Sequence, residues 1–372
     1  MQNKSNQLRF RRRLNVSGIP DPLAENSRGA VATAKRAIAR TLSSRWVAPA
    51  WGAIAQDRVA FLTLHRFAEP ENGVYGHDPA LLRLALERLR RERYDLIGVS
   101  EAMHRLGERT GFRKRSVVFT MDDGYRGALD QCSDIFLAYD CPLTVFLTTG
   151  FIDGTCWLWW DQIEYICLTS DRASVDVEFE GKPIHLDLGT DQATTRSVLE
   201  ICNWCKSLAD ERKWRFIRCL SQAAEVALPM NAPAHYAPVS WSEARALEKK
   251  GFFFGPHTVT HPILPRTDDG QAKREISQSW SRVRSELKSP ANVLSYPNGD
   301  YGPREVELLA ESGLAAAVTT RPAYPTSGSN GLGGDRRFEI PRFSYPESPE
   351  LLMLVASGFR DIRPTLNAFA TR

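Results

Sequence analysis

The strongest constraint on the fold is a regular alternation between short apolar runs and longer amphipathic segments. From about residue 59 onward, the apolar runs are typical of buried strands, and helical patterns separate them. The runs lie at residues 59–64, 116–121, 143–148, 252–254, 293–296 and 315–319. Strands that alternate with helices of this length predict a parallel sheet in an α/β fold.

One segment interrupts this alternation. Residues 155–235 begin with a cluster of tryptophans and continue as a mostly helical stretch, which indicates an insertion. Candidate functional groups follow several strands, so we favour a closed or distorted (β/α) barrel, with a doubly wound open sheet as the alternative. The chain is thus divided into a basic N-terminal extension at 1–45, expected to be poorly ordered, a barrel at 59–346 that includes the insertion, and a C-terminal helical tail at 347–372.

Local signals mark the starts of two helices. Asp78 is a good N-cap, and Pro79 then occupies the first helical position. Ser240 and Glu243 have the spacing of a capping box. A further helix is expected at residues 303–313.

Charge is distributed unevenly along the chain. Residues 1–45 contain ten of the 48 Lys and Arg residues but only two of the 44 acidic ones, so the remaining chain carries a small acidic excess. A mildly acidic body argues against nucleic acid as a partner. The basic extension is interpreted either as a solvated tail or as a peripheral contact with an anionic membrane.

The number of cysteines and the hydropathy of the sequence indicate the cellular compartment in which the protein is expected. No apolar run of signal-peptide length follows the N-terminal arginines, and none reaches the roughly 18 residues of a membrane span. Seven cysteines, an odd number in a chain long enough to bury a core without disulfides, favour a reducing compartment. We therefore expect a cytoplasmic protein. The C-x-x-C at Cys202 and Cys205 lies in a helical pattern without a second pair, so no redox or zinc role is assigned to it.

Two adjacent carboxylates directly follow the predicted strand at 116–121. Asp122 and Asp123 precede Gly124, at the end of a strand where parallel-sheet enzymes place their functional groups. Neighbouring side chains of an extended backbone diverge, so one carboxylate can ligate a metal while the other accepts a proton. A solvated turn is the alternative, because Asp-Asp-Gly also suits a turn.

Two histidines follow the predicted strand at 252–254. His257 and His261 are expected on one side of a helical turn, where both can bind one metal ion; the alternative is a pair of ordinary histidines. Two neutral His with one Asp supply the three protein ligands of an open catalytic zinc-type site, and a second Asp can take a proton from water. This combination predicts a hydrolase of amides or esters.

In this order, the two motifs resemble those of the polysaccharide deacetylase family (carbohydrate esterase family 4). Residues 120–124 read T-M-D-D-G, against T-F-D-D-G in the family, and residues 257–261 match its H-[S/T]-x-x-H. Residues 64–66, L-H-R, are similar to the Tyr-His-Arg motif of one branch, and 143–150 with 157–161 look like its following strand and Trp-rich stretch. The resemblance covers about residues 59–346 and implies the distorted (β/α) barrel of this family.

The resemblance also implies roles for the motif residues. Asp122 is the implied general base, and Asp123, His257 and His261 are the implied ligands of a divalent metal, usually zinc. The implied reaction removes N-acetyl groups from an amino sugar in a polysaccharide, an oligosaccharide or a glycolipid precursor. The metal and a backbone N–H would stabilise the oxyanion.

This chain departs from the family pattern at two motifs. The third motif, R-x-P-[F/Y], is S-Y-P-N at residues 295–298, so Ser295 stands where the family has the Arg that steadies the base. Arg342 is the candidate replacement, because a guanidinium can clamp a carboxylate from another loop. The late L-x-H motif is not recognisable, but in the permuted branch of the family the equivalent His comes at the end of the N-terminal strand. The resemblance therefore implies His65 as the general acid; the alternative is a histidine that only forms hydrogen bonds at the mouth of the barrel.

Three residues are candidate substrate contacts. Trp160 and Tyr296 have rings that suit sugar faces, with core packing as the alternative, and Asn298 stands at the aromatic position of the third motif. The Ser/Gly-rich residues 327–334 are expected to form a mobile loop. Two other functions stay open: the same chemistry on a non-sugar amide or O-acetyl ester, and a non-catalytic glycan-binding or assembly protein.

Overall fold

The computed structural model describes Thr41 and residues 58–69, 74–108, 112, 115–325 and 334–359. The predicted N-terminal extension, apart from Thr41, lies outside these residues, as do 327–333 of the predicted mobile loop and the end of the C-terminal tail. Within the described part of the chain, no helix is both long enough and apolar enough to span a membrane.

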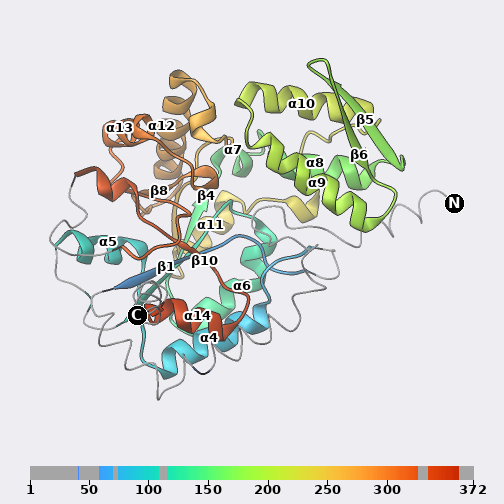
Figure 1. Ribbon diagram of the computed structural model, residues 1–372. Helices are drawn as coiled ribbons and strands as arrows, with labels where there is room; N and C mark the ends of the chain where they lie inside the picture. The colour runs from blue at the N-terminus through green and yellow to red at the C-terminus, as the bar shows by residue number, and fades with distance from the viewer. Residues whose placement is uncertain are drawn as a thin grey trace, which may run out of the picture.

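A parallel six-stranded sheet lies at the centre of the molecule (Figure 1). The main path is β10-β1-β3-β4-β7, and β2 also pairs with β3; every pairing is parallel. The three central strands are buried along their whole length, as expected for strands covered on both faces. The strands are β1 (Val59–Leu64), β2 (Asp95–Leu96), β3 (Ser116–Met121), β4 (Leu143–Leu147), β7 (Phe253–Pro256) and β10 (Phe343–Ser344).

A second parallel pair, β8 (Val293–Ser295) and β9 (Ala316–Val318), extends this arrangement. The Ala291 N–H donates to the Phe254 carbonyl in β7 at 2.7 Å, and the Ile340 N–H donates to the Ala317 carbonyl in β9 at 3.0 Å. Neighbouring strands therefore follow one another from β7 through β8 and β9 toward β10. In the described residues, however, the β8-β9 pair is not joined by strand pairing to the six-stranded sheet. The predicted α/β class with a parallel sheet is confirmed.

Helices cover the sheet and connect its strands. In Figure 1, α4 (Pro79–Arg91), α6 (Arg126–Ala138) and α14 (Pro349–Ala356) lie below the sheet, and α4 packs against both of the others. On another side, α12 (Asp269–Glu286) packs against β7 and against α13 (Pro303–Ser312). The remaining helices of this part are α5 (Val99–Gly107), α7 (Thr149–Ile152), α11 (Trp241–Glu248) and the short 3-10 turns η3 (Ala234–Tyr236), η4 (Leu264–Arg266), η5 (Pro297–Gly299) and η6 (Gly334–Phe338).

The insertion forms a separate group of elements, drawn in green at the upper right of Figure 1. It contains α8 (Trp159–Thr169), α9 (Asp191–Cys205) and α10 (Asp210–Ala223), together with an antiparallel hairpin of β5 (Ser174–Phe179) and β6 (Lys182–Asp187). The mostly helical reading of this segment overlooked the hairpin. The signal was present, because S-V-D-V-E-F alternates strictly between exposed and buried residues.

The predicted helix starts are confirmed. The Asp78 carboxylate accepts the Ala80 N–H at 2.7 Å, with Pro79 at the first helical position. Ser240 and Glu243 form the reciprocal capping box at the start of α11. Most predicted strands agree with the observed ones to within one or two residues.

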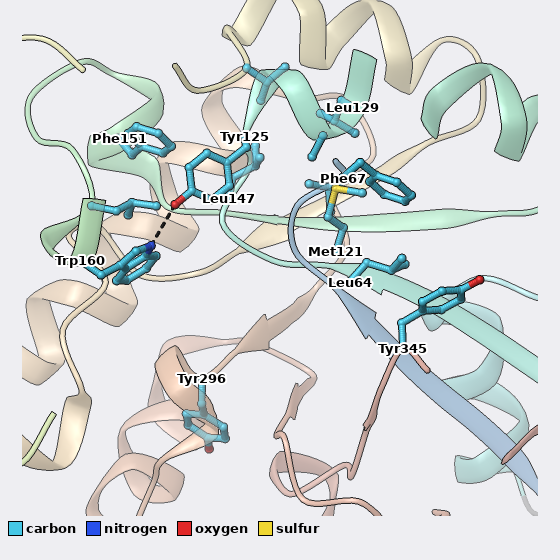
Figure 2. Close-up of a cluster of buried hydrophobic side chains, with 14 of the residues drawn as sticks. Leu64, Phe67, Met121, Tyr125, Leu129, Leu147, Phe151, Trp160, Tyr296 and Tyr345 are labelled. Carbon is cyan, nitrogen blue, oxygen red and sulfur yellow. Dashed lines mark hydrogen bonds between the residues drawn. The ribbon is translucent and has the colours of Figure 1, made fainter. Parts of the chain in front are cut away.

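The main core reaches the ends of the central strands. Leu64 and Met121 end β1 and β3, and Figure 2 shows them packed near Phe67. Leu147, at the end of β4, belongs to the same cluster. Because these apolar side chains are fully buried and closely packed, the backbone of the residues that follow them along the chain is held in a fixed position.

Candidate active site

The predicted site residues converge at one end of the parallel sheet. His65 follows β1, Asp122 and Asp123 follow β3, and His257 follows β7. Arg342 immediately precedes β10, and its long side chain reaches across the sheet end. Parallel strands bring these segments together because their carboxyl ends meet at the same edge.

Asp122 is clamped by a buried guanidinium. Arg342 donates from Nη1 to Asp122 Oδ1 at 2.8 Å and from Nη2 to Asp122 Oδ2 at 2.7 Å. This two-point contact fixes the plane of the carboxylate as well as its position. Arg342 therefore lies where the sequence analysis placed the replacement for the missing third-motif arginine.

Three hydroxyl groups complete the surroundings of this ion pair. Ser295 Oγ donates to Asp122 Oδ2 at 3.2 Å and accepts from Arg342 Nη2 at 2.9 Å. Thr120 Oγ1 accepts from Arg342 Nη1 at 2.9 Å, and Thr63 Oγ1 lies 3.4 Å from Asp122 Oδ2. Ser295 thus replaces the family's arginine with a small side chain that contacts both members of the new pair.

These partners keep Asp122 ionised. Burial by itself would raise the pKa of this carboxyl, but the charge and hydrogen bonds of Arg342, together with His257 and His65, hold the pKa well below its usual range. Asp122 is therefore an anion at every physiological pH.

His65 lies beside the same carboxylate. Its Nε2 is 3.9 Å from Asp122 Oδ2, and its side chain is 22% exposed. Burial lowers the pKa of His65 to about 4, against the opposing charge of Asp122. His65 is accordingly a neutral imidazole at pH 7.

Asp123, His257 and His261 form a second, adjacent cluster. The Nε2 atoms of both histidines lie 3.6 Å from Asp123 Oδ1, and one ligand atom from each residue lies within 4.8 Å of the others. Burial raises the pKa of Asp123 well above its usual range, and the neighbouring charges of Asp122 and Asp161 raise it further.

The backbone that carries the histidines is not helical, which corrects the prediction of a helical turn. Thr258 has φ 64° and His261 has φ 56°, both in the left-handed region. Pro262 also restricts the preceding residue away from helical geometry. The imidazoles still converge, because the loop folds back on itself.

One histidine is oriented by a backbone carbonyl. His257 Nδ1 donates to the Ser295 carbonyl oxygen at 2.7 Å, which leaves the lone pair on Nε2 directed toward Asp123. Burial lowers the pKa values of His257 and His261, so both are neutral imidazoles. A neutral ring with a fixed tautomer is the form that binds a metal.

The cluster fits a divalent metal ion. Asp123 Oδ2 is buried and has no hydrogen-bond partner among the described residues, and Asp123 Oδ1 meets the Nε2 atoms of both histidines only at 3.6 Å, beyond hydrogen-bond distance. Buried polar atoms are normally satisfied, so unpartnered atoms in a His₂Asp set indicate a ligand site. Two imidazole nitrogens and a carboxylate are a zinc-type donor set with room for further ligands.

Trp160 forms a wall of the site. Its ring meets the His261 ring edge to face at 4.6 Å, and its Nε1 donates to the Tyr125 hydroxyl at 3.0 Å (Figure 2). The Tyr125 hydroxyl donates in turn to Asp161 Oδ2 at 2.8 Å. Trp160 is buried in this position, and its predicted contact with a sugar stays a prediction.

The other two predicted substrate contacts lie beside the end of β8. The Tyr296 ring is buried and stacks on Tyr301 with centroids 4.9 Å apart. Asn298 is exposed, and its amide donates to Asp300 Oδ2 at 2.7 Å. Their roles toward substrate also stay predictions.

Sequence reasoning missed several residues that support the site. Arg66 is buried with its guanidinium 4.2 Å from the centre of the Tyr125 ring and 3.6 Å from Asp161 Oδ1. Glu275 binds the backbone of the histidine loop from α12. Arg66 belongs to the quoted L-H-R segment, whereas Glu275 lies in a helical pattern with no distinguishing feature.

The chain is similar in sequence and in fold to polysaccharide deacetylases. A profile of the polysaccharide deacetylase family matches residues 211–317, which include both histidines. The Streptococcus pyogenes deacetylase PplD is 15% identical, with a TM-score of 0.52 over 81% of this chain and 98% of that one. A polysaccharide deacetylase from Bacillus cereus is 13% identical, with a TM-score of 0.50 over 81% of this chain and 69% of that one. No protein with a curated function matches the sequence.

These comparisons confirm the predicted resemblance to the polysaccharide deacetylase family and the predicted fold, while the similarity of residues 64–66 to the motif of one branch stays a prediction. At such low identity, the solved structures establish the fold alone. The family profile indicates a hydrolase that acts on carbon–nitrogen bonds and supports carbohydrate de-N-acetylation in general.

Proposed function

We propose that this protein is a metal-dependent hydrolase that removes N-acetyl groups from an amino sugar within a polysaccharide, an oligosaccharide or a glycolipid precursor. The proposal rests on one observation: two adjacent carboxyl groups have pKa values that are shifted in opposite directions. Asp122 is held as an anion by Arg342, whereas Asp123 Oδ1 faces two neutral imidazoles and Asp123 Oδ2 has no hydrogen-bond partner in the described part of the chain. This arrangement separates a proton acceptor from a ligand cluster.

Asp123, His257 and His261 would hold the metal, with zinc favoured by the donor set. When bound, such an ion polarises the acetyl carbonyl and lowers the pKa of water. The protein contributes rigidity, because all three ligands are buried and His257 is oriented by the Ser295 carbonyl.

Asp122 is the proposed general base. As water attacks the acetyl carbon, its proton passes to Asp122, which Arg342 and Ser295 hold in a fixed orientation. Because the pKa of Asp122 lies below its usual range, the base is already ionised before substrate enters. Holding it in place spares the entropy of ordering a mobile carboxylate.

His65 is the proposed general acid. With its pKa lowered to about 4, it carries no proton to donate at pH 7 until it receives one. Asp122 Oδ2, 3.9 Å from His65 Nε2, is the nearby source. The proton then goes to the sugar nitrogen as the carbon–nitrogen bond breaks, which releases acetate and a free amine.

Acetate release tests the proposal directly. Purified protein is incubated with N-acetylhexosamine oligosaccharides, with added zinc and with chelator in parallel. We expect release that chelator abolishes and zinc restores. No release from folded, zinc-loaded protein, on this panel and on O-acetyl esters and non-sugar acetamides, would refute a deacetylase function.

A further inference from the structure

The loop that carries both histidines adopts a costly backbone conformation. It connects β7 to η4, and two of its non-glycine residues, Thr258 and His261, have left-handed φ angles of 64° and 56°. This region is disfavoured for residues with a side chain, because Cβ comes too close to the following carbonyl oxygen. The loop therefore requires contacts from outside itself to hold this shape.

One carboxylate on a different element provides those contacts. Glu275 lies on α12, and its Oε2 accepts the Val259 N–H at 2.7 Å and the Thr260 N–H at 2.9 Å. Its Oε1 accepts the Thr260 hydroxyl at 2.7 Å. The side chain is buried, with the residue 7% exposed, so these bonds do not compete with bulk water.

The opposite side of the loop is anchored by the start of α7. The Thr149 N–H donates to the Thr258 carbonyl at 3.0 Å, and the Gly150 N–H donates to the Val259 carbonyl at 2.8 Å. The peptide groups between the two histidines are thus held from both sides, with N–H groups on Glu275 and carbonyls on α7.

We propose that Glu275 is a positioning residue that sets the spacing of His257 and His261 for metal binding. It acts through the backbone of Val259 and Thr260, two of the three residues between the histidines, and not by direct contact with the ion. Truncating it leaves two backbone N–H groups without acceptors, and the loop then relaxes away from the left-handed conformation that brings the imidazoles together. This inference rests on the proposed metal-dependent function.

Substitutions at Glu275 separate hydrogen bonding from charge. Glu275→Met keeps a side chain of similar length but removes both acceptors. Glu275→Gln removes the charge, yet its amide oxygen can accept both backbone N–H groups while its NH₂ group donates to the Thr260 hydroxyl. We therefore expect E275M to weaken metal binding and E275Q to bind metal like the wild type.

Glu305 provides a matched control. It is also a buried helical glutamate, but it belongs to the start of α13, where its Oε2 accepts the Gly302 N–H at 2.7 Å and its Oε1 pairs with the Arg304 guanidinium at 2.6 Å. Glu305→Met should lower the melting temperature without changing metal affinity. A purely structural role for Glu275 would give E275M the same behaviour as E305M.

The experiment is zinc titration of the metal-stripped full-length chain by calorimetry, together with cobalt absorption spectra and thermal melts. We expect E275M to lose about 10- to 100-fold in zinc affinity, a loss typical of residues that orient metal ligands, and to show an altered cobalt spectrum. Should E275M fail to fold, Glu275→Asp, which withdraws the carboxylate by one methylene, is expected to bind zinc more weakly than E275Q.

The outcomes test the positioning role of Glu275 separately from the metal site itself. A wild type that binds zinc, alongside an E275M variant of equal affinity, would overturn the positioning role while leaving the proposed function intact. An E275Q variant as weak as E275M would also overturn it, because charge and not hydrogen bonding would then be responsible. A wild-type chain that binds no zinc would overturn the metal site, and the role of Glu275 with it.

Discussion

Replacing Arg342 with Met should strongly destabilise the fold, and the size of the loss can be worked out from the structure. Arg342 is fully buried and makes two hydrogen bonds to Asp122, one each to Thr120 and Ser295, and one to the Thr319 carbonyl. Met fills part of the same volume but offers no charge. Asp122, 2% exposed, would then be a buried anion without its cation.

The expected loss of unfolding free energy is about 3–5 kcal/mol, the range for breaking a buried ion pair from one side. The loss should depend on pH. In the wild type the pKa of Asp122 is lowered, so its ionisation stabilises the native state above the unfolded pKa and this contribution disappears as pH falls. The gap between wild type and R342M should therefore be full at neutral pH and shrink in acid.

Urea unfolding would measure this loss of unfolding free energy in wild type, R342M, D122N and the double variant D122N/R342M. Asn in place of Asp122 removes the unpaired charge, so the double variant should be more stable than R342M alone. A loss below about 1 kcal/mol for R342M, the size of an exposed pair, would refute the reasoning. So would strictly additive effects of the two substitutions.

Three further predictions follow from other buried groups. Asp122→Asn should lower turnover at least about 100-fold, the contribution of a general base, with zinc affinity by calorimetry retained; unchanged turnover would exclude Asp122 as the base. Burial lowers the pKa of His77 to about 4, so His77 alone should contribute a loss of about 3 kcal/mol to the pH dependence of wild-type stability between pH 6.5 and 4, because the unfolded chain then binds the proton more readily. The stability of His77→Phe, measured by urea melts at several pH values, should lack this contribution. Identical pH profiles of stability for wild type and H77F would contradict the prediction. Lys213→Met should cost about 3–5 kcal/mol in the same assay, since Lys213 is buried and donates to the buried Asp210 at 2.6 Å; a loss under about 1 kcal/mol would count against a buried pair.

The positions of the catalytic candidates could be predicted because sheet geometry determines them. Once the apolar runs before Asp122 and His257 are recognised as parallel strands, the residues that follow them must lie at the same edge. Arg342 could also be suggested, because the serine at position 295 leaves Asp122 without its usual partner. The first prediction used a rule that holds for any parallel sheet, whereas the second depended on the resemblance to the family's third motif.

The local conformations could not be predicted in the same way. The i, i+4 spacing of His257 and His261 suits a helix, but tertiary contacts from Glu275 and α7 stabilise a different backbone. Glu275 is 16 positions from Val259 in the chain, so no local pattern connects them. The hairpin could have been predicted from a local pattern, because exposed and buried residues alternate strictly in β5. The Trp-rich start and the helical patterns of the surrounding segment favoured a helical prediction instead.

The two adjacent carboxylates show how one dipeptide can present two different environments, which fit the two roles proposed for them. Asp122 and Asp123 share the same strand end and the same burial, so burial raises the pKa of both. The difference comes from the direction of the side chains, because Asp123 has a left-handed φ of 75° and faces the imidazoles, whereas Asp122 faces Arg342. Asp122 is thus paired with a protein cation, whereas Asp123 has only neutral imidazoles beside it and fits an external cation. A cation at Asp123 would favour its ionised form, so zinc binding should release protons, and the number released should fall as pH rises.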